Sequence, residues 1–434
     1  MSNKQAFSDM KPRTKLQRQV IAMSQCLSPI TEKQKKWAFF HCFNHYGRRT
    51  KKGAAACLEC GYTWNDKFLK PGASVCPHCG CKIEIIETRK QCLKRDEAYF
   101  CVLTTFRGYQ VLRYFDLYVT RRVGREAWYG CKEVVQLWIT PEGKYIPIAR
   151  LRPLFACYAD SWNWNTDMEV RPVNSCYDIN PNFVYPWTRV IPTLKRNGFR
   201  GELYGCSPLR LFQTLLTNNR AETLLKAGQY PMFCHEVKSG VCSDSKYWPS
   251  IRICMRRGYF ISDGSMWCDY IDLLRYFNKD VLSARYVCPV DLAAEHDRLE
   301  RKKRERLKKE EFQRKLRQAQ EAEENFRELK SRFFGINFAD DTICVRVLES
   351  VAEYVQEGEL MHHCVYTSAY YSRPDSLILT AQIGGQHIET VEVSLKTFQV
   401  VQSRGVCNKP TEYHDRIVNL VERNMDQIRR CMSV

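Results

Sequence analysis

The sequence lacks any apolar run approaching the roughly 20 residues that cross a bilayer. Its first residues, MSNKQAFSDMKPRTK, also lack the apolar stretch of a secretory signal peptide. The 22 cysteines do not indicate a disulfide scaffold, because most stand singly in apolar or helical stretches, where a reduced thiol packs as a small hydrophobic group. We therefore expect a cytoplasmic protein that has no membrane partner.

Acidic residues are too few to balance the basic ones. The 434 residues include 67 Lys or Arg and 48 Asp or Glu, so the formal net charge is +19. Such a charge attracts polyanions, because neutralising phosphates releases their counterions. Nucleic acid is therefore the leading partner class, and a role in solubility alone is the alternative. Hydrophobic residues make up 44% of the chain, which is typical of a folded protein.

No repeat of fixed period divides the chain, but its composition changes along its length. We predict an α+β multidomain protein, because β-branched and aromatic stretches alternate with stretches of helical periodicity. Six segments are expected: a basic helical N-terminal segment (1–53), a zinc ribbon (54–90), an antiparallel β-rich domain (91–187), a helical region (188–290), a long charged helix or linker (291–335) and a small C-terminal α+β module (336–434).

Local signals support these segments. Thr31 and Gln34 have the spacing of a helix capping box before KKWAFFHCFNHYG. The run Pro141-Glu142-Gly143 is typical of a hairpin turn between two strands, and Gly384-Gly385 is typical of a second one. After the last three expected strands, TEYHDRIVNLVERNMDQIRRCM predicts one closing helix.

Proline and glycine are absent from residues 295–332, which predicts one long helix. This segment has 14 Lys or Arg against 10 Asp or Glu, so it explains only a small part of the net charge. Its basic first half, RLERKKRERLKK, could lie along a phosphate backbone, or the helix could be a solvated spacer. A protein partner or self-association through the same residues is a further alternative.

Four cysteines form two CxxC pairs, and each pair is followed by glycine. Fifteen residues separate the pair of Cys57 and Cys60 from the pair of Cys76 and Cys79. This spacing lets each pair present two sulfurs to one ion, and it predicts a zinc ribbon that holds one Zn²⁺. Four thiolates leave no open position on the metal, so the expected role is structural. Cys81 could compete with Cys79, although the CxxC spacing favours Cys79.

Basic and aromatic residues surround these cysteines. The residues that we predict could contact nucleic acid are Arg48, Arg49, Lys51, Lys52, Tyr62 and Trp64. Aromatic rings stack on unpaired bases in proteins that bind single strands. The two aromatic residues could equally fill the small core of the ribbon.

Two imidazoles and a thiol stand together at His362, His363 and Cys364. As a metal site they would need further ligands, for which His387 and His414 are available. As a nucleophile, Cys364 would need a nearby imidazolium or a helix N-terminus to lower its pKa. The third alternative is that one of the residues packs in the core and the others face solvent.

A hairpin follows this cluster. If Lys396-Thr397 is its turn, residues whose numbers sum to 793 face one another across the two strands. Glu389 would then lie opposite Arg404 and form a cross-strand ion pair with it. The same register pairs Val393 with Val400 and Val391 with Gln402. Glu392 would then lie on the opposite face with Thr390 and Ser403, so the two glutamates would not form a carboxylate pair.

The segments GELMHHCVYTSAYY, DSLILTAQI and IETVEVSLKTFQVVQSRGVCNKPTEYHDRIVNLVERNM resemble the PcfJ-like family of conjugative and other mobile genetic elements. The front of the chain is similar as well, in KPRTKLQRQV, SPITEKQKKWAFFHCFNHYG and CLECG. The resemblance covers nearly the whole chain and implies a role in the transfer or maintenance of mobile-element DNA, which favours DNA over RNA. It supplies no reaction. The candidate positions in the matching region are His362, His363, Cys364, Glu389, Glu392, Gln402, Arg404, Gly405 and Asn408.

Three functions follow as hypotheses. The first is an accessory protein that binds nucleic acid and is braced by zinc. The second is an enzyme, a nucleic-acid-directed hydrolase or transferase, that uses His363 or Cys364. It requires the candidate side chains to surround one pocket. The third is an adaptor that binds a protein partner through the long helix.

Overall fold

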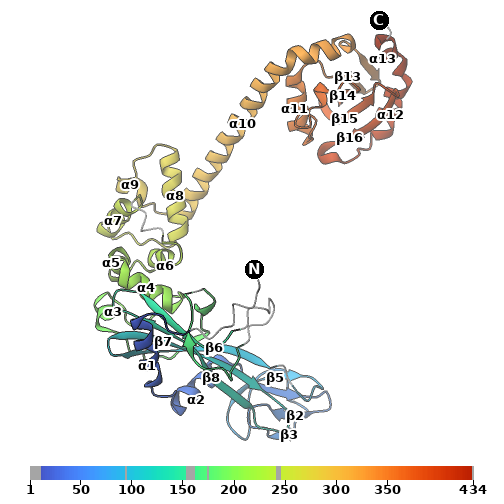
Figure 1. Cartoon of the computed structure of the whole chain (residues 1–434). Coiled ribbons are helices and arrows are strands. Elements are labelled where there is room, and N and C mark those ends of the chain that lie inside the picture. Colours follow the sequence, from blue (N-terminus) through green and yellow to red (C-terminus); the bar gives the residue numbers. More distant parts are fainter. Residues whose placement is uncertain (1–10, 93–94, 153–161, 174, 241–245, 433–434) are drawn as a thin grey trace. The chain divides into compact units, whose positions relative to one another are not determined.

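The computed structural model describes residues 11–92, 95–152, 162–173, 175–240 and 246–432 (Figure 1). The chain has a mixed α+β fold, as predicted, and divides into two compact units, one up to His296 and one from Asp297. The first ten residues of the predicted basic N-terminal segment lie outside the described residues. The division into six segments stays a prediction.

Two capped helices open the described chain. Helix α1 spans Lys15–Gln25 and helix α2 spans Glu32–Cys42. Each begins with a complete capping box, in which a threonine hydroxyl accepts the N–H of a glutamine three residues on and the glutamine amide oxygen accepts the N–H of the threonine. The box predicted at Thr31 is confirmed. Helix α1 was not predicted, although Thr14 and Gln17 have the same spacing.

The cysteine pairs lie on a five-stranded sheet with the order β3-β2-β1-β5-β4. Its strands are β1 (Tyr46–Arg49), β2 (Ala54–Cys57), β3 (Thr63–Asn65), β4 (Gly72–Val75) and β5 (Lys82–Glu87). Strand β1 is antiparallel to β2 and parallel to β5. The sheet that carries the cysteines therefore includes a strand that precedes the predicted ribbon segment.

A six-stranded sheet with the order β10-β9-β8-β7-β6-β11 follows. Its strands are β6 (Asp96–Phe106), β7 (Tyr109–Thr120), β8 (Trp128–Ile139), β9 (Tyr145–Ala149), β10 (Glu169–Val170) and β11 (Phe183–Val184). The predicted turn at Pro141-Glu142-Gly143 joins β8 to β9, and Gly143 has the positive φ of +82° that a tight turn needs. Helix α1 packs over Val111 and Trp138, and helix α2 packs over Phe115.

The next region of this unit is helical, as predicted. Its helices are α3 (Pro192–Arg196), α4 (Pro208–Thr217), α5 (Asn219–Lys226), α6 (Tyr230–Ser239), α7 (Trp248–Arg256), α8 (Gly264–Tyr276) and α9 (Ala284–Val287). Proline occupies the first turn of α3, α4, α6 and α7, where its missing N–H costs no helical hydrogen bond. Asp263 caps α8 through the backbone N–H of Met266.

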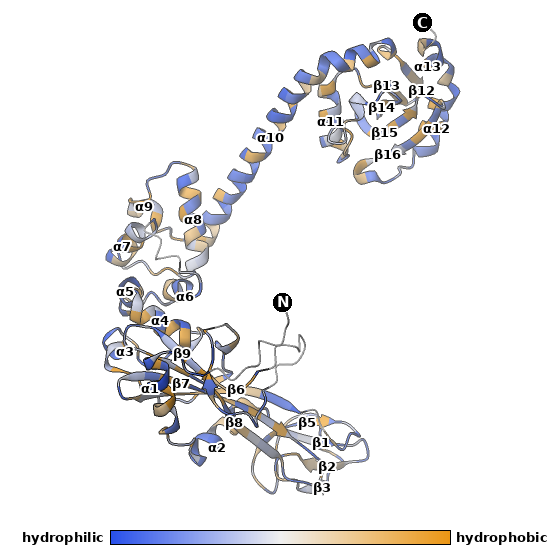
Figure 2. Ribbon diagram, viewed as in Figure 1, coloured by the Kyte–Doolittle hydropathy of each residue, from blue (hydrophilic) through white to orange (hydrophobic). Residues whose placement is uncertain are grey.

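The long charged segment forms one helix, α10 (Leu292–Lys330), and this prediction is confirmed. Figure 2 shows that most of its residues are hydrophilic. Its last turns pack by Ala319 and Phe326 against helix α11 (Val351–Met361). The fully buried ammonium group of Lys330 donates hydrogen bonds to the carbonyls of Pro374 and Ser376, and burial lowers the pKa of this lysine to about 8.

The C-terminal unit is built on a five-stranded antiparallel sheet with the order β12-β13-β14-β15-β16. The strands are β12 (Asn337–Asp340), β13 (Ile343–Val347), β14 (Ser376–Ile383), β15 (Gln386–Ser394) and β16 (Gln399–Arg404). Gly384-Gly385 forms the predicted turn between β14 and β15. The sequence predicted only the last three strands.

Helices cover both faces of this sheet. Helix α11 and the end of α10 cover Ile378 on one face. The other face, which carries Val391 and Val393, is covered by α12 (His414–Arg423) and α13 (Met425–Met432). The prediction of one closing helix is wrong, because the chain breaks at Asn424 and lets both helices pack on the sheet.

The predicted register of the last hairpin is correct at its turn and wrong beyond it. Val393 pairs with Val400 as expected, but Glu392 then pairs with Gln402. Val401 is an extra residue on β16, a β-bulge, and it is 58% exposed. The bulge moves Ser403 to the face of Glu389 and brings Arg404 opposite Thr390, so the predicted Glu389–Arg404 pair does not form.

Candidate functional site

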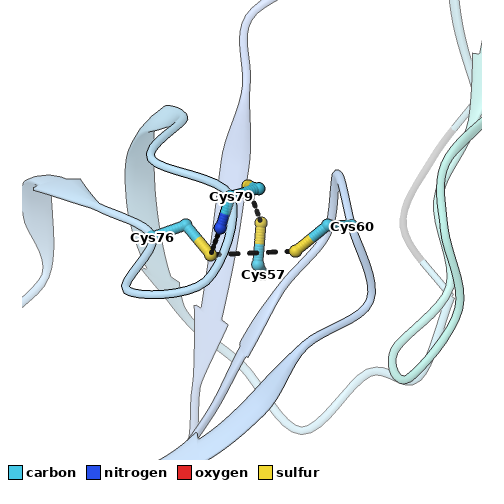
Figure 3. A group of neighbouring side chains, drawn as sticks. All are labelled: Cys57, Cys60, Cys76 and Cys79. Atoms are coloured by element: carbon cyan, nitrogen blue, oxygen red, sulfur yellow. Dashed lines mark hydrogen bonds between the residues drawn. The ribbon is translucent and has the colours of Figure 1, made fainter.

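The four predicted cysteine ligands converge on one point (Figure 3). Their sulfur atoms all lie within 4.8 Å of one another, with 4.0 Å between Cys57 and Cys79 and 3.7 Å between Cys60 and Cys76. Sulfurs at the corners of a tetrahedron around zinc would be about 3.8 Å apart, from a Zn–S bond of about 2.3 Å. The group therefore has the dimensions of a four-thiolate metal site.

The two CxxC turns have matching backbone hydrogen bonds. Gly61 N–H donates to the carbonyl of Cys57 and Gly80 N–H donates to that of Cys76, at 3.1 and 3.0 Å. Both glycines have positive φ, +78° and +69°, which a residue with a Cβ rarely adopts. The thiol of Cys81 instead points to the carbonyl of Lys82, so Cys79 is the member of the group, as the spacing predicted.

Burial raises the pKa of the Cys57 thiol above its ordinary value, so this side chain would be protonated without a cation. A coordinated cation deprotonates such a thiol outright. Within the described residues, no other group of three or more His, Cys, Asp or Glu has metal-binding geometry. His362, His363 and Cys364 do not form such a group.

The first CxxC turn is attached to the six-stranded sheet by a buried polar network. The carboxylate of Glu59 lies 3.1 Å from Nε of Arg121, whose side chain has no exposed surface. Arg121 also donates to Asp96 at 2.7 Å. The other carboxylate oxygen of Glu59 accepts the hydroxyl of Tyr129 and lies 3.3 Å from His45. The hydrogen bonds and ion pairs of Glu59 therefore attach the first CxxC turn to the six-stranded sheet.

Four of the residues predicted to contact nucleic acid are basic, and two of these four are held by other groups of the protein. Arg48 is buried and donates to the carbonyls of Thr88 and Arg89, so it holds the end of β5. Arg49 pairs with Glu87 at 3.3 Å. Lys51 and Lys52 are exposed in the turn between β1 and β2. Only these two lysines of the predicted basic group are open to a ligand.

An aromatic row runs beside the cysteines. The ring of Tyr62 lies nearly parallel to those of Trp64 and His78, at centroid distances of 6.1 and 4.9 Å. Tyr62 is 42% exposed, whereas Trp64 packs partly against the core of the ribbon. Trp64 thus fits the alternative of a core residue, and stacking of Tyr62 on a base stays a prediction. His78 was not predicted, although it lies inside the second CxxC pair.

The C-terminal unit contains a pocket of about 340 Å³ on the sheet face that α11 covers. Its buried residues are Val365, Ile378 and Thr390, and its more open rim includes Cys364, Arg404 and Asn408. The remaining lining residues are His363, Tyr370, Glu392 and Gln402.

Six of the nine candidate positions line this pocket: His363, Cys364, Glu392, Gln402, Arg404 and Asn408. His362, Glu389 and Gly405 do not. His362 is exposed and ends α11 in a left-handed conformation with φ +53°. Glu389 lies on the opposite face of the sheet.

Glu389 is a fully buried carboxylate that connects β15 to the segment before α12. It accepts hydrogen bonds from the hydroxyl of Ser403, from the N–H and hydroxyl of Thr411, and from His414 at 3.0 Å. Burial alone would raise the pKa of Glu389, but these hydrogen bonds outweigh it and hold the pKa below its ordinary value. Its contacts are those of a structural group.

Both ring nitrogens of His363 are held by the protein. Nε2 lies 2.7 Å from the carbonyl of Gly405, which only accepts, so Nε2 carries a proton. Nδ1 lies 3.2 Å from the hydroxyl of Thr390, which in turn lies 2.6 Å from the buried carboxylate of Glu357. His387 contacts the other oxygen of Glu357 at 2.5 Å. The sequence reasoning missed Glu357, for which the only signal is a carboxylate on the buried side of an apolar helix.

The pocket lies in a region that matches a known family. The family model of PcfJ-like proteins matches residues 266–418. The chain carries a PcfJ-like region. The resemblance predicted from the sequence is confirmed there, and every pocket residue lies within the PcfJ-like region. The resemblance of the front of the chain lies outside this match and stays a prediction. No curated protein and no solved structure is detectably similar to the chain.

The positive charge is unevenly distributed between the two units. Residues 1–296 contain 44 Lys or Arg and 26 Asp or Glu, whereas residues 297–434 contain 23 and 22. The unit with the cysteine site therefore carries nearly all of the net charge, and the unit with the PcfJ-like pocket is close to neutral. Among the described residues, no helix is both long enough and apolar enough to cross a membrane.

Proposed function

We propose that the protein is a nucleic-acid-binding accessory protein of a mobile genetic element, braced by one zinc ion. It would act in the cytoplasm, on or beside the DNA of that element. The PcfJ-like region supports the link to mobile elements, and this link favours DNA over RNA.

The observation that carries the proposal is the location of the charge. An excess of 18 positive charges within residues 1–296 attracts a polyanion much more strongly than the same charge spread over the chain would. A general solubility role would not require such a concentration, because the C-terminal unit is close to neutral.

Zinc is the metal that best suits the cysteine site. Soft thiolate ligands in a tetrahedral group favour Zn²⁺ or an iron–sulfur centre, and two short CxxC turns on a small sheet are typical of zinc ribbons. When bound, zinc would cross-link the two turns and neutralise part of the thiolate charge. Because Cys57, Cys60, Cys76 and Cys79 fill its four positions, its role would be to hold the fold.

The exposed part of the ribbon offers a contact surface for nucleic acid. Lys51 and Lys52 supply free ammonium groups, and Lys67 lies against the same turn at Gly53. Tyr62 and His78 present partly exposed rings farther along the ribbon. Cations for the backbone and rings for the bases are the combination that single-strand binders use.

Catalysis in the PcfJ-like pocket is the alternative, because six candidate side chains do meet there. The contacts of His363 favour binding instead. A general base needs a nitrogen free to take a proton, and both nitrogens of His363 are engaged within the protein. The thiol of Cys364 is not restrained in this way. If the parent protein cleaves nucleic acid, a Cys364→Ala variant that still cleaves it would show that Cys364 is not the nucleophile.

The test is to identify what co-purifies with the intact chain. Sequencing of bound nucleic acid and elemental analysis of bound metal should find DNA and one zinc per chain. Protein that is free of nucleic acid at low salt, and does not bind added DNA or RNA, would contradict the proposal.

A further inference from the structure

We propose that the pocket of the PcfJ-like region binds one unpaired nucleotide of a nucleic-acid strand, with its phosphate at Arg404 and the edge of its base at Glu392. The choice of nucleic acid as partner rests on the proposed function. The pocket itself is a separate observation, in a different unit from the basic surface.

The size and lining of the pocket suit a small, partly apolar ligand. Its volume of about 340 Å³ lies at the lower end of the range of roughly 300 to 1,000 Å³ for small-molecule sites. Ile378 and Val365 form an apolar floor, with exposures of 2% and 5%. Tyr370 adds an aromatic wall. A flat base could lie against these surfaces, as extruded bases do in other pockets.

Arg404 is the cation of the pocket. It is exposed, and no hydrogen bond or ion pair engages its guanidinium among the described residues. The side chain of Asn408 is likewise without a partner there and adds an amide donor to the same rim. A guanidinium presents paired N–H donors that match the oxygens of a phosphate. An anionic group is therefore expected at this end.

Glu392 is the fixed acceptor at the other end. Its carboxylate accepts the hydroxyl of Ser376 and the amide N–H of Gln402, both at 2.8 Å. These hydrogen bonds set its orientation and leave further lone pairs free. Glu392 lies one same-face position along β15 from Thr390, which is opposite Arg404 in the register. Glu392 and Arg404 are therefore diagonal neighbours on adjacent strands, and such positions are about 7 to 8 Å apart.

This arrangement selects among bases. A carboxylate accepts hydrogen bonds from the amino groups of adenine, cytosine and guanine, whereas thymine carries carbonyl oxygens and no amino group. Thymine offers a single N3–H donor between two carbonyl oxygens, and the lone pairs of these oxygens would face the carboxylate. We therefore expect the pocket to discriminate against thymine.

The backbone around the pocket is strained, which is common at binding sites. His362, Ala369, Cys407 and Asn408 are non-glycine residues with φ between +51° and +63°. They belong to the two segments that frame the pocket, and His363 joins these segments through its bond to Gly405. The fold thus holds the rim in a costly conformation.

The experiment measures binding of the four deoxynucleoside monophosphates to the full chain by isothermal titration calorimetry. The amino-bearing nucleotides should bind, and thymidine monophosphate should bind more weakly. Arg404→Gln should weaken binding by about tenfold to a hundredfold, because it removes a charge-assisted hydrogen bond. Arg423→Gln is the matched control, because it removes the same charge from an exposed position on α12, across the sheet. Equal effects of the two variants would overturn the proposal.

Alkylation of thiols tests where on the protein the nucleotide binds. Cys364 lines the pocket and is exposed, whereas the exposed Cys26 lies on the other unit. Bound nucleotide should slow the modification of Cys364, as measured on its peptide, and leave that of Cys26 unchanged. Unchanged modification of Cys364 at saturating nucleotide would overturn the assignment to the pocket.

Glu392→Gln should remove the discrimination against thymine, and discrimination that persists in this variant would overturn the role of Glu392.

The two proposals can fail separately. If the basic unit does not bind nucleic acid, long strands will bind no more tightly than mononucleotides, yet mononucleotides will still protect Cys364. If the pocket proposal is wrong, long strands will bind with the same affinity to the parent and to Arg404→Gln, and mononucleotides will leave Cys364 unprotected.

Discussion

Glu59 and Arg121 form a 3.1 Å ion pair that joins the metal-binding turn to the six-stranded sheet. The arginine side chain has no exposed surface and the glutamate is 11% exposed. A buried arginine that loses one of its two carboxylate partners keeps the cost of its desolvation with less compensation. Loss of the ion pair should therefore destabilise the attachment of the turn to the sheet.

Replacement of Glu59 should separate metal binding by the turn from the attachment of the turn to the sheet. Glu59→Gln leaves all four cysteines in place, so bound metal should remain at one ion per chain. The buried pair no longer forms, and the free energy of unfolding should fall by about 3 kcal/mol. Denaturant unfolding and elemental analysis measure the two quantities. Glu84→Gln, an exposed position on β5, is the control and should change stability by less than about 0.5 kcal/mol.

Removal of the metal should unfold the ribbon first. Without the ion, no metal–sulfur bonds join the two CxxC turns, and the small core around Ile83 and Ile85 is then insufficient. Chelation should increase hydrogen exchange in β1 to β5 and leave residues 297–434 unchanged. Cys79→Ser should reproduce this effect, whereas Cys81→Ser should retain the metal because its sulfur points away. Unchanged exchange in the ribbon would show that the cysteines are not a structural metal site.

The buried carboxylate of Glu389 should make the C-terminal unit sensitive to acid. Its pKa in the folded state lies below the ordinary value of 4.5, so the stabilisation is complete above that pH and is lost as the pH falls through the folded-state pKa. Glu389→Gln should cost about 2 kcal/mol at neutral pH. The difference between parent and variant should shrink in acid, as measured by denaturant unfolding at several pH values.

A difference that stayed constant down to pH values well below 4.5 would contradict this account of Glu389. Glu422→Gln, an exposed position on α12, serves as the control and should show no such dependence. Because Glu389 lies across the sheet from the pocket, its replacement should not change nucleotide affinity at neutral pH while the unit remains folded.

The free lysines of the ribbon should contribute to nucleic-acid affinity. Replacing Lys51 and Lys52 with glutamine should weaken binding and reduce the slope of log Kd against log salt by about one to two, because each lysine would neutralise one phosphate. The same change at Lys144 and Lys195, two exposed lysines outside the ribbon, is the control for charge alone. Equal effects of the two pairs would assign no special role to the ribbon turn.

The sequence predicted features that depend on neighbouring residues. The cysteine site follows from two CxxC pairs with glycines, and the capping box at Thr31 and the hairpin at Gly143 follow from equally short patterns. The long helix follows from the absence of proline and glycine. These are local signals, and the structure confirms the helix, the cap, the turns and the convergence of the cysteines.

The pocket depends on contacts that a local pattern does not contain. The bulge at Val401 shifts the register by one residue, so Gln402 and Arg404 face the pocket together with Glu392. Alternation alone placed them on the face of Glu389. Likewise, Arg48 belongs to a basic run in the sequence, but its side chain points inward to two carbonyls. Charge in a sequence does not reveal which cations are already bound.

The salt dependence of DNA binding by the intact, metal-loaded protein tests the central claim most directly. With its charge concentrated in residues 1–296, the protein should bind single-stranded DNA with a Kd that rises steeply with salt. The affinity of a protein that binds about 6 to 10 phosphates falls roughly a thousandfold or more between about 50 and 200 mM salt. A Kd that does not change with salt, or no binding at the lowest salt, would contradict the account.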